Sequence, residues 1–357
     1  MATPTSPLLD LLGIRVPIIQ APMAGVSSPA MAAAVSESGG LGSLGVGAMN
    51  AAKAREAIGQ FRALSAGPLN INVFTHRPAQ ADAVKQAAWI ERLRPHFERY
   101  DAEPPAALGE IYTSFLEDED MLAMLVQEKP NVVSFHFGLP HPAQIEALRG
   151  AGIVLLGSAT NLEEAQAFQR AGVDAVVAQG YEAGGHRGMF DPDAPDTRLG
   201  TFALTRVLAR GITLPVIAAG GIMDGSGIAA VLKLGASAAQ LGTAFVATDE
   251  SLADKGYRER LFSDAAHHTV MTRAISGRPA RSLANAFTEL GASIPVAAIP
   301  DYPIAYDAGK ALHGAAKAAG EFNYGAQWAG QGAPLVRAMS TRALMQVLRE
   351  EWEQAAR

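Results

Sequence analysis

The hydrophobic and polar positions of the chain alternate between two patterns, short apolar runs and longer segments with a helical period. Most of the apolar runs lack a polar face, which is typical of strands that are covered on both sides. We expect eight such strands, at Pro17–Met23, Leu41–Gly45, Leu69–Phe74, Val132–Gly138, Ile153–Ala159, Ala175–Gly180, Pro215–Gly221 and Ala238–Thr243. Eight strand–helix repeats favour an α/β fold of the TIM-barrel type, a closed (β/α)8 barrel, over an open doubly wound sheet.

Signals for helix ends support this interpretation. Ser28 and Pro29 suit the N-cap and first position of a helix after the first strand. Asn161 is placed to cap a second helix, which Gly172 would end. A third helical pattern follows Asp224.

Two stretches interrupt the repeat. Residues 76–131 are too long for one crossover helix, and residues 251–330 follow the last strand with helical patterns and Gly/Pro-rich joints. We expect both to lie over the C-terminal mouth of the barrel, the second as a mainly helical domain that covers the substrate. The expected organisation is a ligand-binding barrel at 1–75 and 132–250, an insertion at 76–131, a lid at 251–330 and a C-terminal helix that packs back on the barrel at 331–357.

Composition and charge narrow the possible partners. Of the 357 residues, 49% are hydrophobic and 18% charged, enough for a large core, and the net charge is −6. A negative chain argues against nucleic acid or an anionic membrane as a partner. The first 15 residues lack a basic segment followed by an apolar one, and no apolar run approaches a membrane span, so we expect a cytoplasmic protein.

The chain contains no cysteine. This excludes disulfides, a thiolate nucleophile, iron–sulfur clusters and cysteine-bound zinc. The histidines and carboxylates show no ligand spacing either, so we expect no metal site. A redox enzyme with this composition needs an organic cofactor.

The ends of the last two predicted strands suit a phosphate group. In barrels of this type phosphate commonly binds after strands seven and eight. Here these ends are Ala219–Ile222 and Gln240–Thr243, where glycines expose backbone N–H groups and Thr243 adds a hydroxyl. A pair of tight turns without a ligand is the alternative interpretation.

Other strand ends carry polar side chains. An Asn at 70 or 72 could offer an amide donor and a carbonyl acceptor to a flavin ring, and the sequence leaves open which one does so. The sixth strand ends in Gln179 and continues into a glycine-rich segment that contains His186. Histidine titrates near neutral pH and can act as acid, base or donor, so His186 is the leading catalytic candidate; a histidine of a surface loop is the alternative.

A second histidine lies on the fourth strand. His136 shares a face with Ser134 and Gly138, opposite Phe135 and Phe137, if the strand alternates regularly. It either faces the site or is a hydrogen-bonded core histidine.

One glycine motif is ambiguous. The segment 40–45 matches GxGxxG, the dinucleotide fingerprint. That motif follows a strand and opens a helix, whereas here the glycines follow a helix and overlap a strand. We therefore disfavour a Rossmann domain.

Taken in order, several segments resemble the nitronate monooxygenase family over nearly the whole chain: IIQAPMAGVSSPAMAAAVSESGGLGSLG, NINVF, QGYEAGGHRG, LPVIAAGGI and AAQLGTAF. Members of that family are FMN-dependent barrels that oxidise nitronates with O2 and without a nicotinamide. Relatives that share the early motifs reduce enoyl thioesters or quinones with NAD(P)H, so an NAD(P)H-dependent FMN reductase is the alternative function. A non-enzymatic FMN-binding protein is a third possibility.

The resemblance implies roles for matching residues. His186 takes the place of the catalytic histidine, and Pro22 and Met23 would lie along the isoalloxazine. The remaining FMN contacts would come from Asn72, Gln179, Gly184, Gly220, Gly221, Gln240, Leu241, Gly242 and Thr243. The substrate pocket would be lined by Tyr112, His136, Tyr257, Tyr302, Tyr306 and Lys310.

Tyr302, Tyr306 and Lys310 follow at intervals of four, which predicts one helix face. An ordinary helix face with a solvated lysine is the alternative. A lysine in the pocket suits a second carboxylate, so we expect propionate 3-nitronate as the small anionic substrate, O2 as co-substrate and detoxification as the purpose. The sequence is compatible with a monomer or a homodimer.

Overall fold

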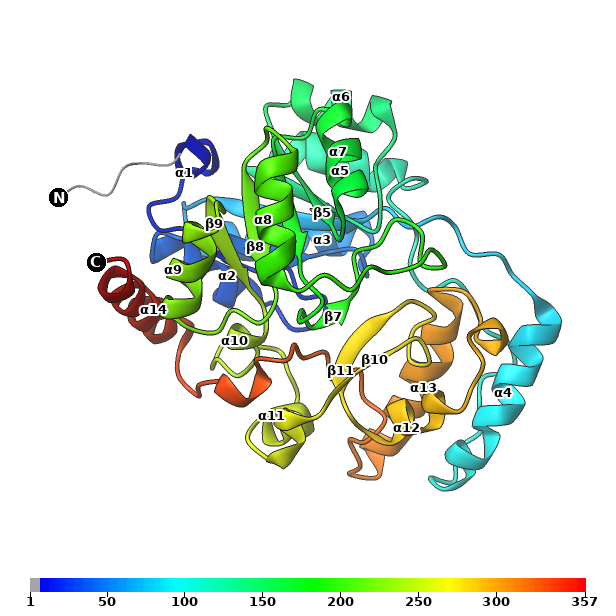
Figure 1. The fold of residues 1–357 in the computed structure, drawn as a ribbon. Coiled ribbons are helices and arrows are strands. Elements are labelled where there is room, and N and C mark those ends of the chain that lie inside the picture. Colours follow the sequence, from blue (N-terminus) through cyan, green and yellow to red (C-terminus); the bar gives the residue numbers. More distant parts are fainter. Residues whose placement is uncertain (1–6) are drawn as a thin grey trace.

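A computed structural model describes residues 7–357 of the chain (Figure 1). Its main sheet contains eight parallel strands, and each falls inside one of the eight predicted runs. They are β1 (Ile18–Gln20), β2 (Gly42–Gly45), β3 (Leu69–Phe74), β4 (Val132–His136), β5 (Val154–Ala159), β6 (Ala175–Gln179), β8 (Val216–Ala219) and β9 (Ala238–Leu241).

The strands are arranged as a barrel, in the order β1-β9-β8-β6-β5-β4-β3-β2. The two outer strands meet at a parallel bridge between Ile19 and Leu41. There the Gln20 N–H donates to the Leu41 carbonyl at 3.0 Å, and the Leu41 N–H donates to the Ile18 carbonyl at 3.1 Å. The predicted TIM-barrel fold is confirmed.

Helices cover the outside of the barrel, and one closes the end at which the strands begin. The covering helices are α2 (Pro29–Glu37), α3 (Ala51–Leu64), α5 (Glu119–Glu128), α6 (Pro142–Gly150), α7 (Leu162–Ala171), α8 (Thr201–Gly211) and α9 (Gly225–Lys233). The first helix, α1 (Pro7–Leu12), places Leu8 and Leu12 in the same apolar cluster as Ile19, Val132 and Ile217 of the strands. The N-terminal end of the barrel is therefore filled, and only the other end is free to hold a ligand.

Local signals for helix ends were interpreted correctly. The Ser28 hydroxyl accepts from the Met31 N–H at 3.0 Å, with Pro29 as the first residue of α2. Asn161 accepts from the Glu164 N–H at 2.9 Å at the start of α7, which ends at Gly172 with a φ of +83°. These positions have a local physical cause, a free N–H or a left-handed residue, which makes them predictable.

The GxGxxG segment has a packing role. A Cβ on Gly42 would lie 2.0 Å from the Ala32 carbonyl oxygen of α2, and one on Gly40 would lie 2.6 Å from the Ile18 carbonyl oxygen. The glycines thus let α2 and β1 approach the second strand closely. This packing role agrees with the expectation that the segment is not the fingerprint of a Rossmann domain.

A second apolar core lies beside the mouth of the barrel. Helix α4 (Ala83–Glu98) runs alongside α13 (Ile304–Ala318), on the side away from the barrel (Figure 1). Trp89, Leu93 and Phe97 of α4 share a buried cluster with Ile304 and Leu312 of α13. The segment inserted after β3 and the segment after β9 therefore fold together.

Residues 251–330 contain strands as well as the expected helices. Helices α11 (Lys255–Leu261), α12 (Ala286–Ala292) and α13 are joined by β10 (Thr269–Thr272) and β11 (Ala280–Leu283). These two strands pair antiparallel with each other, and β11 also pairs with the two-residue strand β7 (Gly185–His186). The sequence did not indicate this sheet, because four- and two-residue strands from distant segments carry no periodic signal.

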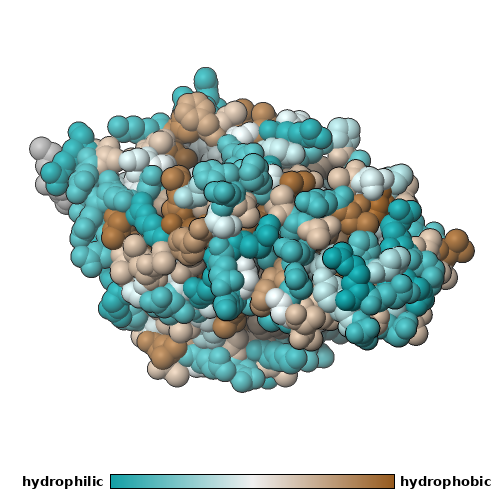
Figure 2. Space-filling view, turned by 90° about the horizontal axis from the view of Figure 1, so that it is seen from below, coloured by the Kyte–Doolittle hydropathy of each residue, from teal (hydrophilic) through white to brown (hydrophobic). Residues whose placement is uncertain are grey.

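The remaining elements complete the barrel side. Helix α10 (Thr243–Val246) follows β9, and α14 (Thr341–Ala355) packs on α9 and α2 through Leu344, Met345, Leu348 and Trp352. Short 3-10 turns occur at Asp264–His267, Val296–Ala298 and Ala333–Leu335. Hydrophobic residues are scattered among hydrophilic ones on the face seen in Figure 2. No helix within residues 7–357 is both long enough and apolar enough to span a membrane.

Candidate active site

A cavity of about 480 Å³ lies at the C-terminal mouth of the barrel, where the second core faces it. The strand ends supply one side, and α11, α13 and residues 324–330 supply the other. Of the site residues expected from the sequence, those lining it are Pro22, Met23, Asn72, Tyr112, His136, Gln179, Gly184, His186, Gly220, Gly221, Gln240, Gly242, Thr243, Tyr257, Tyr302, Tyr306 and Lys310.

Leu241 is the one expected residue that does not line the cavity. Its side chain is 1% exposed and belongs to the apolar cluster between the barrel and α9 and α14. Side chains alternate along a strand, so Gln240 and Gly242 face inward while Leu241 faces the helices.

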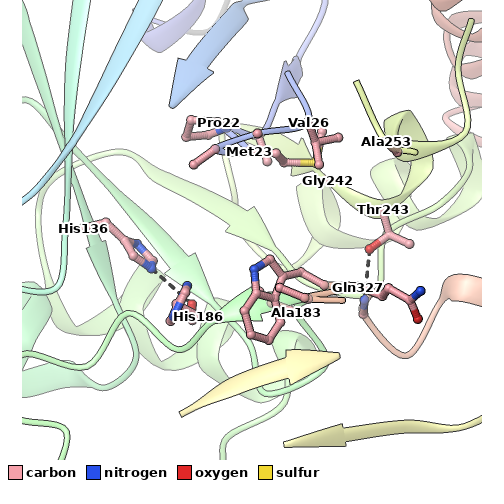
Figure 3. Close-up of a pocket in the computed structure, with 18 of the residues that line it drawn as sticks. Pro22, Met23, Val26, His136, Ala183, His186, Gly242, Thr243, Ala253 and Gln327 are labelled. Atoms are coloured by element: carbon pink, nitrogen blue, oxygen red, sulfur yellow. Dashed lines mark hydrogen bonds between the residues drawn. The ribbon is translucent and has the colours of Figure 1, made fainter. Parts of the chain in front are cut away.

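One end of the cavity offers free backbone donors. The N–H groups of Gly221, Ile222 and Gly242 donate to no carbonyl or side chain within residues 7–357. All three residues line the cavity. Next to them the Thr243 hydroxyl accepts from the Gly330 N–H at 3.0 Å (Figure 3). Backbone N–H groups seldom stay without an acceptor, so this cluster suits an anionic group such as a phosphate.

The two asparagines of β3 differ in their position relative to the cavity. Asn72 lines the cavity, and its amide nitrogen donates to the Ser134 hydroxyl at 2.9 Å and the Ser134 carbonyl at 3.1 Å. Asn70 instead donates to the Ser43 hydroxyl at 3.1 Å, deeper in the barrel. The carbonyl oxygen of Asn72 is therefore the acceptor available to a ligand.

His186 is held from behind by two side chains. Its backbone carbonyl accepts from Gln179 Nε2 at 2.9 Å and from His136 Nε2 at 3.1 Å. Gln179 Oε1 accepts from the Gly188 N–H at 2.7 Å. Both amide atoms of Gln179, expected to hold a cofactor, thus fix the segment that carries His186.

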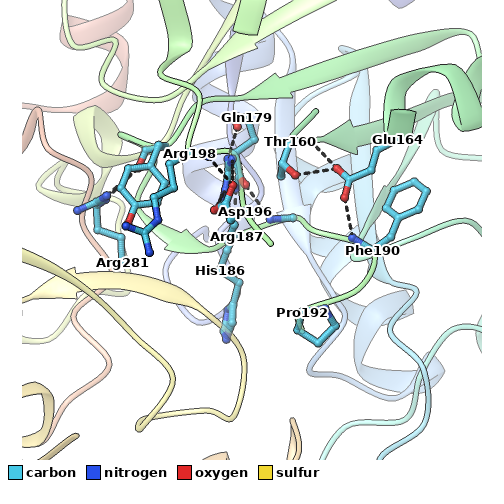
Figure 4. Close-up of polar contacts among 12 residues, drawn as sticks. Thr160, Glu164, Gln179, His186, Arg187, Phe190, Pro192, Asp196, Arg198 and Arg281 are labelled. Atoms are coloured by element: carbon cyan, nitrogen blue, oxygen red, sulfur yellow. Dashed lines mark hydrogen bonds and ion pairs between the residues drawn. The ribbon is translucent and has the colours of Figure 1, made fainter. Parts of the chain in front are cut away.

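The segment after β6 is anchored by one largely buried ion pair and by hydrogen bonds (Figure 4). Arg187 makes two 3.0 Å contacts with the Asp196 carboxylate and donates to the Gln179 carbonyl. Further along, Glu164 accepts from the Phe190 N–H at 3.0 Å. In Figure 4 the His186 side chain points away from this network, so the interpretation of a surface-loop histidine is wrong.

The His186 ring is enclosed by aromatic groups. Its Nε2 is hydrogen-bonded to the Ser276 hydroxyl at 2.9 Å, and its ring centre lies 5.5 Å from Phe137, 5.3 Å from Tyr302 and 5.1 Å from Trp328. Burial, and then the neighbouring His136, lowers the pKa of His186 well below its ordinary value. The imidazole is neutral at neutral pH, and Nδ1 is the nitrogen left for a ligand.

His136 has a similar environment. Burial lowers the pKa of His136 to about 4, although its hydrogen bond to the His186 carbonyl acts in the opposite direction. With Nε2–H used in that bond, His136 is a neutral imidazole in the cavity wall. In Figure 3 the two histidines line one wall, and Pro22 and Met23 another.

Phe137 does not lie opposite His136, contrary to the expected alternation. Strand β4 ends at His136, and Phe137 has a φ of +83°. This left-handed residue turns the ring back toward the site, where its centre lies 4.6 Å from the His136 ring and 5.4 Å from Tyr302. The period-two rule fails because the strand ends two residues earlier than the apolar run.

The tyrosines and the lysine meet, but not on one helix face. Helix α13 begins at Ile304, so Tyr306 and Lys310 share a face while Tyr302 precedes the helix. Lys310 Nζ nevertheless lies 4.7 Å from the centre of the Tyr112 ring and 5.3 Å from that of Tyr306. Burial raises the pKa of Tyr306 to about 12, so its hydroxyl stays protonated at neutral pH.

Sequence reasoning missed two residues that lie behind the cavity wall. Ser276 bonds to His186, and Arg278 is buried over the ring of Phe137. Gly277 between them has a φ of +96°, and a Cβ there would lie 2.5 Å from the Tyr302 backbone nitrogen. The segment SGRP resembles an ordinary Gly/Pro joint, and no residue-level signal marks it as part of a site.

Comparison with known proteins decides the family. The family model described as nitronate monooxygenase matches residues 5–351. The chain belongs to the nitronate monooxygenase family. A nitronate monooxygenase of Paraburkholderia phytofirmans is 64% identical over 348 residues, covering 98% of this chain and 95% of the relative. One of Pseudomonas aeruginosa is 53% identical over 341 residues, covering 96% and 97%.

Solved structures agree with membership of the nitronate monooxygenase family. Nitroalkane oxidase from Streptomyces ansochromogenes superposes with a TM-score of 0.88 at 41% identity, covering 98% of this chain and 99% of that one. FabK from Thermotoga maritima superposes with a TM-score of 0.74 at 31% identity, covering 99% and 97%. The resemblance that the sequence motifs indicated is therefore confirmed.

Proposed function

We propose that the protein is an FMN-dependent nitronate monooxygenase that oxidises alkyl nitronates with O2 to a carbonyl compound and nitrite. Propionate 3-nitronate is the proposed substrate and its detoxification the proposed purpose. The supporting observation is one cavity that joins free backbone donors at one end to neutral histidines, tyrosine hydroxyls and a lysine at the other.

The residues present fit FMN. The unpaired N–H groups of Gly221, Ile222 and Gly242 would hold the phosphate. Pro22 and Met23 would lie along the ring system, and the free carbonyl oxygen of Asn72 would accept from a ring N–H. When bound, FMN would supply the redox chemistry, because no side chain of this composition accepts electrons.

The side chains of the site would bind and orient the substrate. A nitronate is already an anion, so it needs donors more than a base. Tyr302 and Tyr306 keep protonated hydroxyls, and Lys310 adds a positive charge at the outer end. His186 would hold the nitronate oxygens through Nδ1–H, or accept the α-proton when a neutral nitroalkane binds. Lys310 would bind the carboxylate of propionate 3-nitronate.

Water is kept from this end of the cavity by packed aromatic groups. The Tyr257 hydroxyl donates to the Trp328 carbonyl, which fixes α11 to residues 324–330. Trp328 in turn covers the His186 ring. A dry wall strengthens the hydrogen bonds that the site makes to a bound anion.

The test uses the purified protein as isolated. Its absorbance spectrum and the nucleotide released on denaturation identify the cofactor, and nitrite release and O2 uptake are followed with propionate 3-nitronate. We expect one FMN per chain and nitrite formation without NADH or NADPH. Rapid anaerobic bleaching of the flavin by NADH or NADPH, with no nitrite from the nitronate, would instead support an NAD(P)H-dependent reductase of quinones or enoyl thioesters.

A further inference from the structure

Arg278 is a buried cation next to the proposed catalytic histidine. It lies in the loop between β10 and β11 and is 4% exposed. One terminal amine donates to the Met189 carbonyl, and the guanidinium carbon lies 4.3 Å from the centre of the Phe137 ring. Burial lowers the pKa of Arg278 only to about 10, so the side chain stays charged at neutral pH.

No carboxylate forms an ion pair with this cation within residues 7–357. The two arginines whose charges act on Arg278 are each paired with an aspartate, in Arg77–Asp191 and Arg273–Asp193. Arg278 Nε has no hydrogen-bond partner in this part of the chain either. A buried charge without a counter-charge opposes folding. Stability therefore does not account for Arg278, whose charge can instead favour an anion in the cavity beyond Phe137.

A single aromatic ring separates Arg278 from the site. The ring centre of Phe137 lies 5.5 Å from that of His186, which places the Arg278 charge within about 10 Å of the His186 ring. Phe137 is itself buried. No layer of water lies along this path, so salt and solvent screen the charge only weakly.

The other groups around His186 provide no competing charge. His136 and His76 are neutral, because burial lowers the pKa of His136 to about 4 and that of His76 to about 3. Burial also raises the pKa of Tyr302 well above its ordinary value, so its phenol is protonated. Arg278 is thus the unpaired buried charge behind this wall of the cavity.

We propose that Arg278 determines the charge specificity of the site, selecting the anionic nitronate over the neutral nitroalkane of the same carbon chain. The proposal rests on the proposed nitronate oxidation. A neutral nitroalkane has the same heavy atoms and nearly the same size but carries no net charge for the cation to attract. The expected preference is roughly tenfold, the factor that Coulomb's law gives for unit charges about 10 Å apart at an effective dielectric constant of about 20.

Lys310 cannot supply this preference in the same way. The residue is exposed although its ammonium lies against the Tyr112 and Tyr306 rings, so counter-ions reach it more readily than they reach Arg278. A charge in water loses most of its influence when salt is raised from about 0.1 M to about 1 M, whereas a buried charge does not. Salt therefore distinguishes the contributions of the two cations.

The experiment compares propyl-1-nitronate with 1-nitropropane as substrates of the FMN-loaded protein. We measure kcat/KM for both in the wild type, in Arg278→Met and in Arg278→Lys. In Arg278→Met the value for the nitronate should fall roughly tenfold and that for 1-nitropropane should stay within about twofold, and Arg278→Lys should retain most of the preference. Equal losses for both substrates, or an unchanged ratio, would overturn the proposal.

Arg281→Met is the matched control. Arg281 is 3% exposed on β11 and donates to the Tyr181 carbonyl, away from the cavity. Its loss should lower stability without changing the ratio of the two kcat/KM values. A change of that ratio as large as in Arg278→Met would show that any buried arginine has the effect, and would refute the specific role.

Two measurements remain informative if Arg278→Met does not fold or if the proposed function fails. In the wild type, the preference for the nitronate should persist in potassium gluconate at about 1 M, and its disappearance would refute the buried charge as its source. Nitrate, a planar anion, should raise the Tm of the wild type and of Arg278→Lys at concentrations roughly tenfold lower than in Arg278→Met. If neither substrate is oxidised, the proposed function is wrong, and the nitrate result alone decides on Arg278.

Discussion

Replacing Asp196 by Asn should destabilise the segment that carries the catalytic candidate. Asp196 accepts two hydrogen bonds of 3.0 Å from Arg187, whose side chain is 2% exposed. The Asn variant keeps the shape but removes the charge and one acceptor, leaving a buried guanidinium without a counter-ion. Breaking a fully buried pair costs about 3–5 kcal/mol, and because the Asp196 side chain is 18% exposed we expect about 2–4 kcal/mol.

Thermal unfolding followed by circular dichroism measures this effect. For a chain of this length the expected loss corresponds to a Tm lower by about 3–5 °C. Asp193→Asn is the control, since Asp193 also pairs with an arginine, Arg273, but its side chain is 73% exposed. Exposed pairs contribute about 0–1 kcal/mol, so this variant should stay near the wild type. Equal effects of the two substitutions would refute the reasoning from burial.

The effect of Asp196→Asn should also depend on pH in one direction. Burial acts to raise the pKa of Asp196, but hydrogen bonds and charge from Arg187 outweigh it and lower the pKa below the ordinary value of 3.8. A carboxyl with a lowered folded-state pKa stabilises the fold above its unfolded-state pKa and loses this contribution as pH falls through the folded-state value. The gap in stability between wild type and variant should therefore be constant near neutral pH and close in strong acid.

Three further predictions concern the cavity. In His186→Asn we expect turnover of propionate 3-nitronate to fall by about 10²- to 10⁴-fold with FMN still bound, as read from nitrite release and the flavin spectrum, and unchanged turnover would remove the role of His186. In Lys310→Met, KM for propionate 3-nitronate should rise at least about tenfold, but less than about threefold for propyl-1-nitronate, which has no carboxylate; equal increases would place the carboxylate elsewhere. Gly277→Ala should lower the free energy of unfolding by at least about 2 kcal/mol, because its Cβ would lie 2.5 Å from the Tyr302 nitrogen at a φ of +96°. Gly320→Ala is the control: its φ is +82° but the space around it is open, so the loss should be about 1 kcal/mol. Similar losses of the two variants in denaturant unfolding would contradict the steric argument.

Much of the barrel could be predicted because its signals are local. Each strand is a run of apolar residues, and each cap is a residue with a defined hydrogen bond, such as Asn161 at the start of α7. The position of the free backbone donors followed from the same reasoning, since glycines at the ends of the last two strands of a barrel are brought together by the closure itself. Leu241 shows the limit of that reasoning. The consecutive residues from Gln240 to Thr243 were all expected to face the ligand, although side chains alternate between the two faces of a strand.

The other half of the site depends on contacts between distant segments, and these leave little trace in a sequence. Strand β7 has two residues and exists because β11, almost a hundred residues later, pairs with it. Gln179 was expected to bind a cofactor, yet its amide is used to fix Gly188 and the His186 carbonyl. Nothing in the local pattern distinguishes a glutamine that binds a ligand from one that positions a loop.

The placement of the site between two cores has a consequence for its chemistry. The barrel contributes Asn72 and free backbone N–H groups, and its Gln179 and His136 side chains anchor the His186 carbonyl. The second core contributes Tyr306 and Lys310 through α13, which is held in place by α4. The geometry between His186 and the tyrosines therefore depends on how α13 packs on α4, not on the barrel. Substitutions in α4 far from the cavity should accordingly change substrate binding while leaving the cofactor end intact, because only one of the two walls would move.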